Sequence, residues 1–580
     1  MGLVLVLRSF VFLSIGVSIL GAQPSIFPLK DIRPGQHGIG RTVFNGSKSE
    51  EFQVEILGVL DNLGPKQSVI LARLSGGPLE KTGVMQGMSG SPVYIDGKLV
   101  GAVALAFSYS KEAITGIRPI EEMLAVQPSP SPVRTEIAAR ERQPQAPEFG
   151  ASKLVDIATP LSFNGFTPAT LEHFGPVLRK LGFEPAQGVS SGGHPQPKMG
   201  DPALLHAGDM ISVQLVSGDL NMGADGTVTL IDGNRVFAFG HQFLSAGGTD
   251  IPFARAQVLA LLPSVQASFK ISTALEWMGS ITQDRSAAIS GELGRRARTI
   301  PISIGFHGSH EPATAYNMQM AADRTLSPLI LQMAVYSVID ANERSLGLGS
   351  FTVKGAIEFE KGIPPVRLDN TYAGDFGVPA MVSNGVAAPL TYALSGGFDA
   401  LSIKDIDISI EASEAKRLLQ VDQITARKDA QPGQNVDLAL SFTGENGAIV
   451  TKHIAYPLPV GTPTGFLTFT VTDAMTSNFA EYMQYAGTLP KSPTQAVTLL
   501  NKLRRNTKAY LRVTRNEITY QAQGVDLPDP PPSLALLLSK SQNPALANQL
   551  AQGNLIAEIP IDMGDSVVSG TKSIQVEVKE

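Results

Sequence analysis

A short turn of small residues, followed at once by a β-hairpin, constrains the fold of this chain more than any other feature. Residues 87–92 read Gly-Met-Ser-Gly-Ser-Pro, and two apolar runs, 93–95 and 98–105, flank Asp96 and Gly97. An Asp-Gly pair between two such runs predicts a type I′ turn, because both of its residues must adopt positive φ angles. We therefore expect a tight turn, a strand, a hairpin turn and a second strand.

Length and composition predict a multidomain, mainly β protein. The 580 residues exceed what one hydrophobic core organises, and 57 glycines with 40 prolines favour many turns. The net charge is −6 and the basic residues are scattered, which argues against a nucleic-acid partner. The chain has no cysteine, so disulfides, thiol nucleophiles and cysteine-ligated metals are excluded, and we expect no metal and no cofactor.

The N-terminus has the pattern of a signal peptide. Arg8 is followed by an apolar run over residues 10–20, and Gly21 and Ala22 supply small residues for cleavage. Residues 1–22 are therefore expected to direct export, to the periplasm or outside the cell, with an uncleaved anchor as the alternative. No later segment is long and apolar enough to span a bilayer, so we expect no stable membrane span after cleavage.

Four regions are expected after the signal peptide. Residues 26–127 form a β-barrel module that bears Ser89, and residues 128–200 are a Pro/Ser-rich linker with a short helix capped by Thr167. A second β-barrel module, residues 205–305, bears His241. Residues 310–580 are expected to be rich in β-sandwich, with a few helices such as one over residues 492–508.

Ser89 and His241 are the candidate catalytic pair. A serine hydroxyl is a weak nucleophile and needs a base beside it. His241 stands out among the eight histidines because it follows an apolar strand and Gly240. A turn serine in one barrel and a strand-end histidine in the other meet in the cleft between them. The alternatives are a simple turn serine and a packed strand-end histidine.

These segments resemble the SpoIVB-type serine peptidase family, whose members activate sporulation signalling by cleaving partner proteins. Residues 84–92 are similar to the family's nucleophile motif, 226–241 to its histidine region, and 279–285 to the segment after the histidine. The resemblance implies two chymotrypsin-like β-barrels, a serine nucleophile with a histidine base, and a protein or peptide substrate. By analogy with chymotrypsin-like peptidases, the backbone N–H groups of Gly87 and Ser89 are expected to form the oxyanion hole.

The chain departs from the family in two ways. The family's histidine block precedes its serine block, whereas Ser89 comes first here, so the order is permuted. The family also carries an acidic residue shortly before the nucleophile, and residues 73–76 contain no carboxylate. Either a Ser/His dyad suffices or another acid orients His241, with Asp284 the first candidate and Asp250 the second.

The sequence thus predicts an exported serine endopeptidase that cleaves other proteins, with a regulatory cleavage as the role suggested by analogy. The alternative is a catalytically silent, envelope-associated binding or scaffold protein on a peptidase-like fold. An esterase that uses the same serine is a further alternative, but the strand-turn-hairpin context differs from the strand-to-helix turn of lipases.

Overall fold

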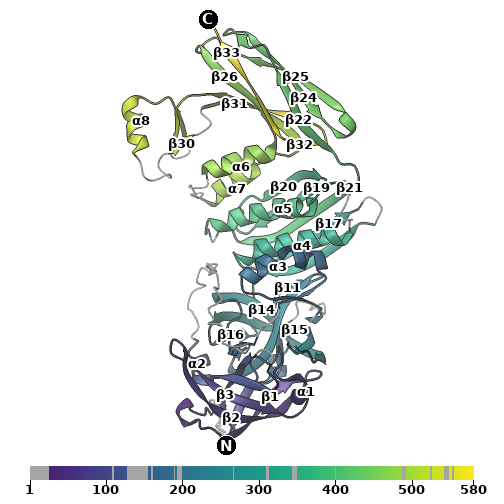
Figure 1. Cartoon of the computed structure of the whole chain (residues 1–580), viewed down its shortest axis with the longest axis vertical. Coiled ribbons are helices and arrows are strands. Elements are labelled where there is room, and N and C mark those ends of the chain that lie inside the picture. Colours follow the sequence, from purple (N-terminus) through teal and green to yellow (C-terminus); the bar gives the residue numbers. More distant parts are fainter. Residues whose placement is uncertain are drawn as a thin grey trace, which may run out of the picture.

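The computed structural model is an elongated stack of four parts in chain order (Figure 1). Two barrels lie at the N-terminal end, a helix-covered sheet follows, and a β-sandwich forms the C-terminal end. The residues that the structure describes are 25–107, 110–126, 154–157, 161–188, 190–191, 199–265, 267–308, 312–342, 349–398, 400–485, 492–522, 525–540, 548–550 and 554–580. The predicted signal peptide, residues 1–22, lies outside them, as do residues 128–153, 158–160, 189 and 192–198 of the predicted linker region.

The first part, here called the serine barrel, is a closed ring of six strands. The ring runs β4-β1-β2-β3-β6-β5, and the pairing of β4 with β5 closes it, while β7 adds to the outside of β5. At the β4–β5 turn Asp96 has φ 49° and Gly97 has φ 71°, which confirms the predicted hairpin. The elements are η1 Leu29–Asp31, β1 His37–Val43, β2 Ser49–Gly64, β3 Gln67–Ser75, α1 Leu79–Thr82, β4 Pro92–Ile95, β5 Lys98–Phe107, β6 Ile114–Pro119, α2 Ile120–Leu124 and β7 Leu154–Asp156.

The second part, here called the histidine barrel, is also a six-stranded ring. Its strands follow the order β11-β14-β15-β16-β13-β12, and the pairing of β12 with β11 closes it. The Thr167 side chain accepts a hydrogen bond from the Thr170 amide at the start of α3, so the predicted helix cap is confirmed. The elements are β8 Leu161–Asn164, α3 Pro168–Lys180, β9 Pro185–Gln187, β10 Ser190–Ser191, η2 Pro202–Leu204, β11 Met210–Gly218, β12 Asn221–Asp232, β13 Arg235–Ala238, β14 Gly247–Leu262, β15 Phe269–Arg285 and β16 Ala288–Leu293.

The third part continues the sheet of the histidine barrel and is covered by helices. Strand β18 pairs with β11, and the order continues through β17, β21 and β19 to β20. Buried side chains of α4 and α5 share one apolar core with this sheet and with the histidine barrel, so the two parts are built as one unit. The elements are β17 Thr299–His307, β18 Thr314–Ala321, α4 Leu326–Asn342, β19 Gly349–Phe359, β20 Val366–Gly374, α5 Val378–Ser395 and β21 Ile403–Ser413.

The fourth part is a β-sandwich with its own apolar core. Its two sheets have the orders β25-β24-β22-β32 and β23-β33-β26-β27-β31, and alternate residues of both sheets fill the space between them. A small sheet, β29-β28-β30, carries α8 to one side (Figure 1). The elements are β22 Leu418–Thr425, β23 Asp429–Ala430, β24 Asn435–Thr443, η3 Glu445–Gly447, β25 Ile449–Pro457, β26 Gly465–Thr472, α6 Ala474–Tyr485, α7 Pro493–Asn501, β27 Lys508–Arg515, β28 Thr519–Ala522, β29 Val525–Pro528, α8 Pro532–Ser539, β30 Asn548–Leu550, β31 Asn554–Asp562, β32 Val567–Ser569 and β33 Thr571–Val578.

Of the residues that the structure describes, 52% are in strands and 19% in helices, so the expected mainly β class is confirmed. The helix expected over residues 492–508 begins as predicted, with the Ser492 side chain as its cap, but ends at Asn501 because the chain then enters β27. The described residues between 299 and 413 form the helix-covered sheet, which begins inside the region expected to be the second barrel and continues into the region expected to be rich in β-sandwich. In the described part of the chain, no helix combines the length and the apolar character that a bilayer crossing requires.

The two barrels meet face to face, and this contact positions the candidate site. Gln86 of the serine barrel forms a bridge with Phe269 of the histidine barrel, and Gly46 forms another with Val258. Buried apolar side chains from both barrels, including Ala102, Phe237 and Ala288, also form one small shared core. The segment just before Ser89 is thus held directly by the barrel that carries His241.

Candidate active site

Ser89 lies on a buried turn whose shape depends on two glycines. Gly87 has φ 91° and Gly90 has φ 94°, a left-handed region that other residues rarely enter. The Ser91 hydroxyl donates to the carbonyl of Met88 at 2.6 Å and ties the turn to itself. The sequence feature that predicted a sharp turn here is therefore realised, and Ser91 has a structural role.

Strand β12 of the histidine barrel holds the turn through three carbonyl groups. The Thr227 amide donates to the Ser89 carbonyl at 2.8 Å, and its hydroxyl donates to the Gly87 carbonyl at 2.9 Å. The Thr229 hydroxyl donates to the Gly90 carbonyl at 2.7 Å. A Cβ on Gly90 would lie only 2.0 Å from the Thr227 carbonyl oxygen, so this close approach requires glycine. The two barrels are therefore joined at the turn that presents Ser89.

Several donors of the turn remain unused. Neither the amide N–H of Gly87 nor that of Ser89 finds an acceptor among the described residues. The Ser89 hydroxyl is buried, at 0% exposure, and it too has no hydrogen-bond partner in the described structure. Buried polar groups are almost always paired, so a cluster of unpaired ones indicates a functional site. Two such amides beside an unpaired hydroxyl are the donors that an oxyanion hole needs.

His241 follows an unusual turn at the end of β13. Phe239 has φ 68° and Gly240 has φ 69°, and a bulky residue in this region costs on the order of 1–3 kcal/mol. The Phe239 amide donates to the Thr227 carbonyl at 3.3 Å, and Gly240 packs against Ala104 of β5. The strained turn is held by both barrels and sets the position of the imidazole.

The protonation of His241 suits a general base. Its Nδ1 lies 2.7 Å from the Gln242 carbonyl, so Nδ1 carries the hydrogen and the lone pair of the neutral ring is on Nε2. Burial lowers the pKa of His241, whereas the charge of Asp156, the Gln242 carbonyl and the charge of Asp284 raise it. The net shift is downward, which keeps the imidazole uncharged near neutral pH.

The Ser89 turn and the turn that precedes His241 are both hydrogen-bonded to Thr227 of β12, but Ser89 and His241 do not form a hydrogen bond with each other. Thr227 donates its amide hydrogen to the Ser89 carbonyl and accepts a hydrogen bond from the Phe239 amide. The Phe239 ring lies 5.9 Å from the His241 ring, centre to centre. The hydroxyl of Ser89 makes no hydrogen bond to the imidazole in this structure. Catalytic hydrogen bonds are often long in free enzymes and shorten when the substrate binds.

Asp284, the first candidate for the acid, supports the loop that follows His241. One of its oxygens accepts from the Phe243 amide at 2.8 Å, and the other accepts from the Leu244 and Ala246 amides at 2.5 and 3.1 Å. Burial raises the pKa of Asp284, against the opposite effect of these amides and of His241. Asp284 is therefore placed to position the His241 loop. Asp250, the second candidate, accepts from the Ser280 hydroxyl and is engaged there.

Asp156 is a second acidic group near His241, and the sequence reasoning missed it. It ends β7, where it pairs with Leu105 of β5, and the neighbouring Ile157 amide donates to the Ala104 carbonyl. Gly240 packs against the same Ala104. Among the influences that raise the pKa of His241, the charge of Asp156 is the largest. An aspartate at the end of a three-residue strand has no sequence motif, so only the structure reveals it.

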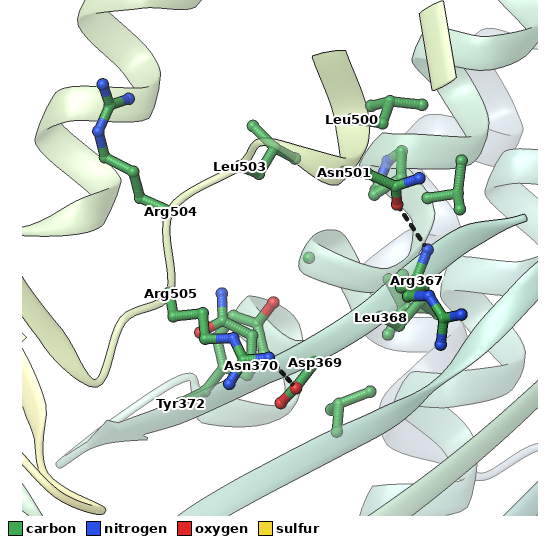
Figure 2. Close-up of a pocket in the computed structure, with 15 residues that line it drawn as sticks. Arg367, Leu368, Asp369, Asn370, Tyr372, Leu500, Asn501, Leu503, Arg504 and Arg505 are labelled. Atoms are coloured by element: carbon green, nitrogen blue, oxygen red, sulfur yellow. Dashed lines mark hydrogen bonds and ion pairs between the residues drawn. The ribbon is translucent and has the colours of Figure 1, made fainter. Parts of the chain in front are cut away.

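A cavity elsewhere in the chain lies apart from these residues. Figure 2 shows it, about 190 Å³ in volume, where the helix-covered sheet meets the segment between α7 and β27. Arg505 pairs there with Asp369, and the Arg367 amide donates to the Asn501 side chain at 2.9 Å. None of the candidate catalytic residues lines this cavity, so it is no part of the candidate active site.

A comparison with known protein families finds a match, and it lies in the serine barrel. Residues 21–124 match the model of the SpoIVB peptidase S55 family, and this segment includes Ser89 and the whole turn. His241 and Asp284 lie beyond the matched segment. No curated protein and no solved structure matches the chain. This match supports the resemblance to the SpoIVB-type serine peptidase family that the turn motif predicts.

Proposed function

We propose that this chain is a serine endopeptidase that cleaves protein or peptide substrates with Ser89 as nucleophile and His241 as general base. One observation carries the proposal. A segment that matches a peptidase family carries a buried serine hydroxyl and two amides that have no hydrogen-bond partner among the described residues, on a turn attached to the strand that also holds the His241 turn. The chemistry needs no cofactor.

The reaction would follow the usual two stages of acyl transfer. His241 Nε2 takes the proton of Ser89 as the serine oxygen bonds to the substrate carbonyl carbon. The amides of Gly87 and Ser89 stabilise the resulting oxyanion, each contributing about 3–4 kcal/mol. His241 then passes the proton to the leaving amine, and water releases the acyl group by the reverse sequence.

The acidic groups would act on His241 from two sides. Asp284 fixes the loop that begins directly after His241 through three amides. The charge of Asp156 favours the imidazolium that forms during the reaction, because it opposes the effect of burial on the His241 pKa. Asp284 and Asp156 together would then fill the role that a single acidic residue has in a standard Ser-His-Asp triad.

Access to the site is restricted in this structure. Ser89 is fully buried and His241 is 2% exposed, so a polypeptide substrate reaches them only after the surrounding chain moves. This enclosure also favours the second candidate function, a catalytically silent binding or scaffold protein. A site that never opens would conserve the fold of a peptidase without its activity.

The site of action is proposed from the N-terminal sequence. The basic Arg8, the apolar run over residues 10–20 and the small residues Gly21 and Ala22 support export to the periplasm or outside the cell. The substrate would then be another exported protein, and a regulatory cleavage is suggested by the family resemblance alone.

Covalent labelling with a fluorophosphonate probe tests the proposed function. The wild-type chain should be labelled at Ser89, and the Ser89→Ala and His241→Ala variants should be labelled about 10³-fold more slowly or not at all. His206→Ala is the matched control, because its side chain is 72% exposed, and it should be labelled at the wild-type rate.

Digestion of an unfolded protein such as casein would then separate a peptidase from an esterase. A wild-type chain that is never labelled, in buffer or after mild urea has loosened the barrel contact, would establish the scaffold function instead.

A further inference from the structure

Lys270 is a buried base beside the serine turn that the proposed mechanism does not use. It lies near the start of β15 and is 2% exposed. Its Nζ donates to the hydroxyl of Thr42 of β1 at 2.7 Å, and its backbone amide donates to the Gln86 carbonyl at 3.3 Å. Within the described structure, no carboxylate forms an ion pair with it. A lysine in such a place needs an explanation, because a buried charge without a counter-charge is costly.

The Lys270 side chain runs directly past Gly87. A Cβ built on Gly87 would lie 3.2 Å from Cδ and 3.4 Å from Cγ of Lys270. The amine, two bonds beyond Cδ, is therefore held behind the turn that carries the candidate oxyanion donors. Through Thr42 the lysine also connects the histidine barrel to the serine barrel at this point.

The surroundings leave Lys270 easy to deprotonate. Burial alone lowers its pKa to about 7. Thr42, Gly87 and the paired Leu261, which lie against it, carry no titratable group. Charged groups on neighbouring segments are paired with other residues: Arg41 pairs with Glu51, Asp209 with His206, and Asp225 accepts from Ser272.

We propose that Lys270 is a positioning residue of the serine site, whose positive charge behind the Gly87 turn favours the oxyanion and whose deprotonation weakens it. This inference rests on the proposed function. Because the amine acts through the turn, we expect an effect of about tenfold on rate, less than the 10²–10³-fold of a direct oxyanion donor. The pH profile of the reaction should then fall on its alkaline side as Lys270 loses its proton near pH 7.

The test is the rate of fluorophosphonate labelling of the full chain between pH 5 and pH 10. In the wild type the rate should fall about tenfold through the Lys270 titration. Lys270→Met keeps most of the alkyl length without the amine, so its rate should be low throughout and lack the fall. Lys98→Met is the matched control, since Lys98 is exposed at the β4–β5 hairpin, and it should keep the wild-type profile.

Thr42→Val supplies a second variant of nearly unchanged shape. It removes the acceptor for the ammonium group, so the fall should move to lower pH. If Lys270→Met keeps the fall, or lowers the rate equally at every pH with the fall intact, Lys270 is merely structural and the inference is wrong. If the wild type is never labelled, the proposed function and the inference fail together. If the wild type is labelled but its labelling rate does not fall as the pH rises, the inference about Lys270 fails and the proposed function stands.

Discussion

Replacement of Gly90 by alanine should separate the two barrels at the active site. The added Cβ would lie 2.0 Å from the Thr227 carbonyl oxygen and 2.5 Å from the Phe239 amide nitrogen. Both are backbone atoms, one within β12 and the other in the strained turn after β13, so neither can rotate away. The turn must therefore withdraw from β12 by about 1 Å or more before ordinary van der Waals contact is restored.

The expected cost has two parts. Alanine at the positive φ of Gly90 costs about 1 kcal/mol. Withdrawal also breaks or lengthens the three hydrogen bonds from Thr227 and Thr229 to the turn, each worth about 1 kcal/mol. The total is about 4 kcal/mol of the free energy of unfolding, and labelling at Ser89 should be lost with it.

Gly97→Ala is the matched control for this variant. Gly97 also has positive φ, 71°, and lies in the same barrel, but an added Cβ there would meet nothing within 4 Å. It should cost only the backbone strain of about 1 kcal/mol. Urea unfolding and calorimetry of the two variants should therefore differ by about 3 kcal/mol. Equal destabilisation of both, with labelling retained, would refute the close contact of the turn with β12.

Three further predictions concern the charged groups of the site. Because burial lowers the pKa of Lys270 from 10.5 to about 7, the unfolded chain binds the proton more tightly than the folded chain does. The free energy of unfolding of the wild type, relative to that of Lys270→Met, should therefore rise by up to about 5 kcal/mol between pH 7 and 10.5. Urea unfolding at several pH values would measure this rise, and a difference that does not change with pH would contradict the shift. Asp156→Asn removes the largest influence that raises the pKa of His241, so the acid side of the labelling profile should move to lower pH; an unmoved profile would place Asp156 too far away to matter. Asp284→Asn leaves one carbonyl oxygen for three loop amides and should cost about 2 kcal/mol with slower labelling, whereas Asp250→Asn should leave the rate unchanged.

Local patterns were sufficient wherever near neighbours in the chain determine the structure. The Asp96–Gly97 turn forms because both residues tolerate positive φ, and α3 begins at Thr167 because its side chain caps the helix. The buried helices α4 and α5 escaped detection, since a helix that is apolar on most of its surface shows little periodicity. The small residues of the serine turn were recognised for the same local reason as the hairpin that follows it.

The sequence alone determined the nucleophile candidate, the histidine candidate and the mainly β class, because each depends on short-range conformational preferences. Only the tertiary structure decided which acidic groups surround His241 and that Lys270 lies behind Gly87. Those neighbours come from β7 and β15, strands distant in the sequence, and they meet because the closing pairings β4–β5 and β11–β12 curl each sheet into a ring. A contact of this kind follows from barrel closure and from the packing of two barrels on one another, and no short stretch of sequence encodes it.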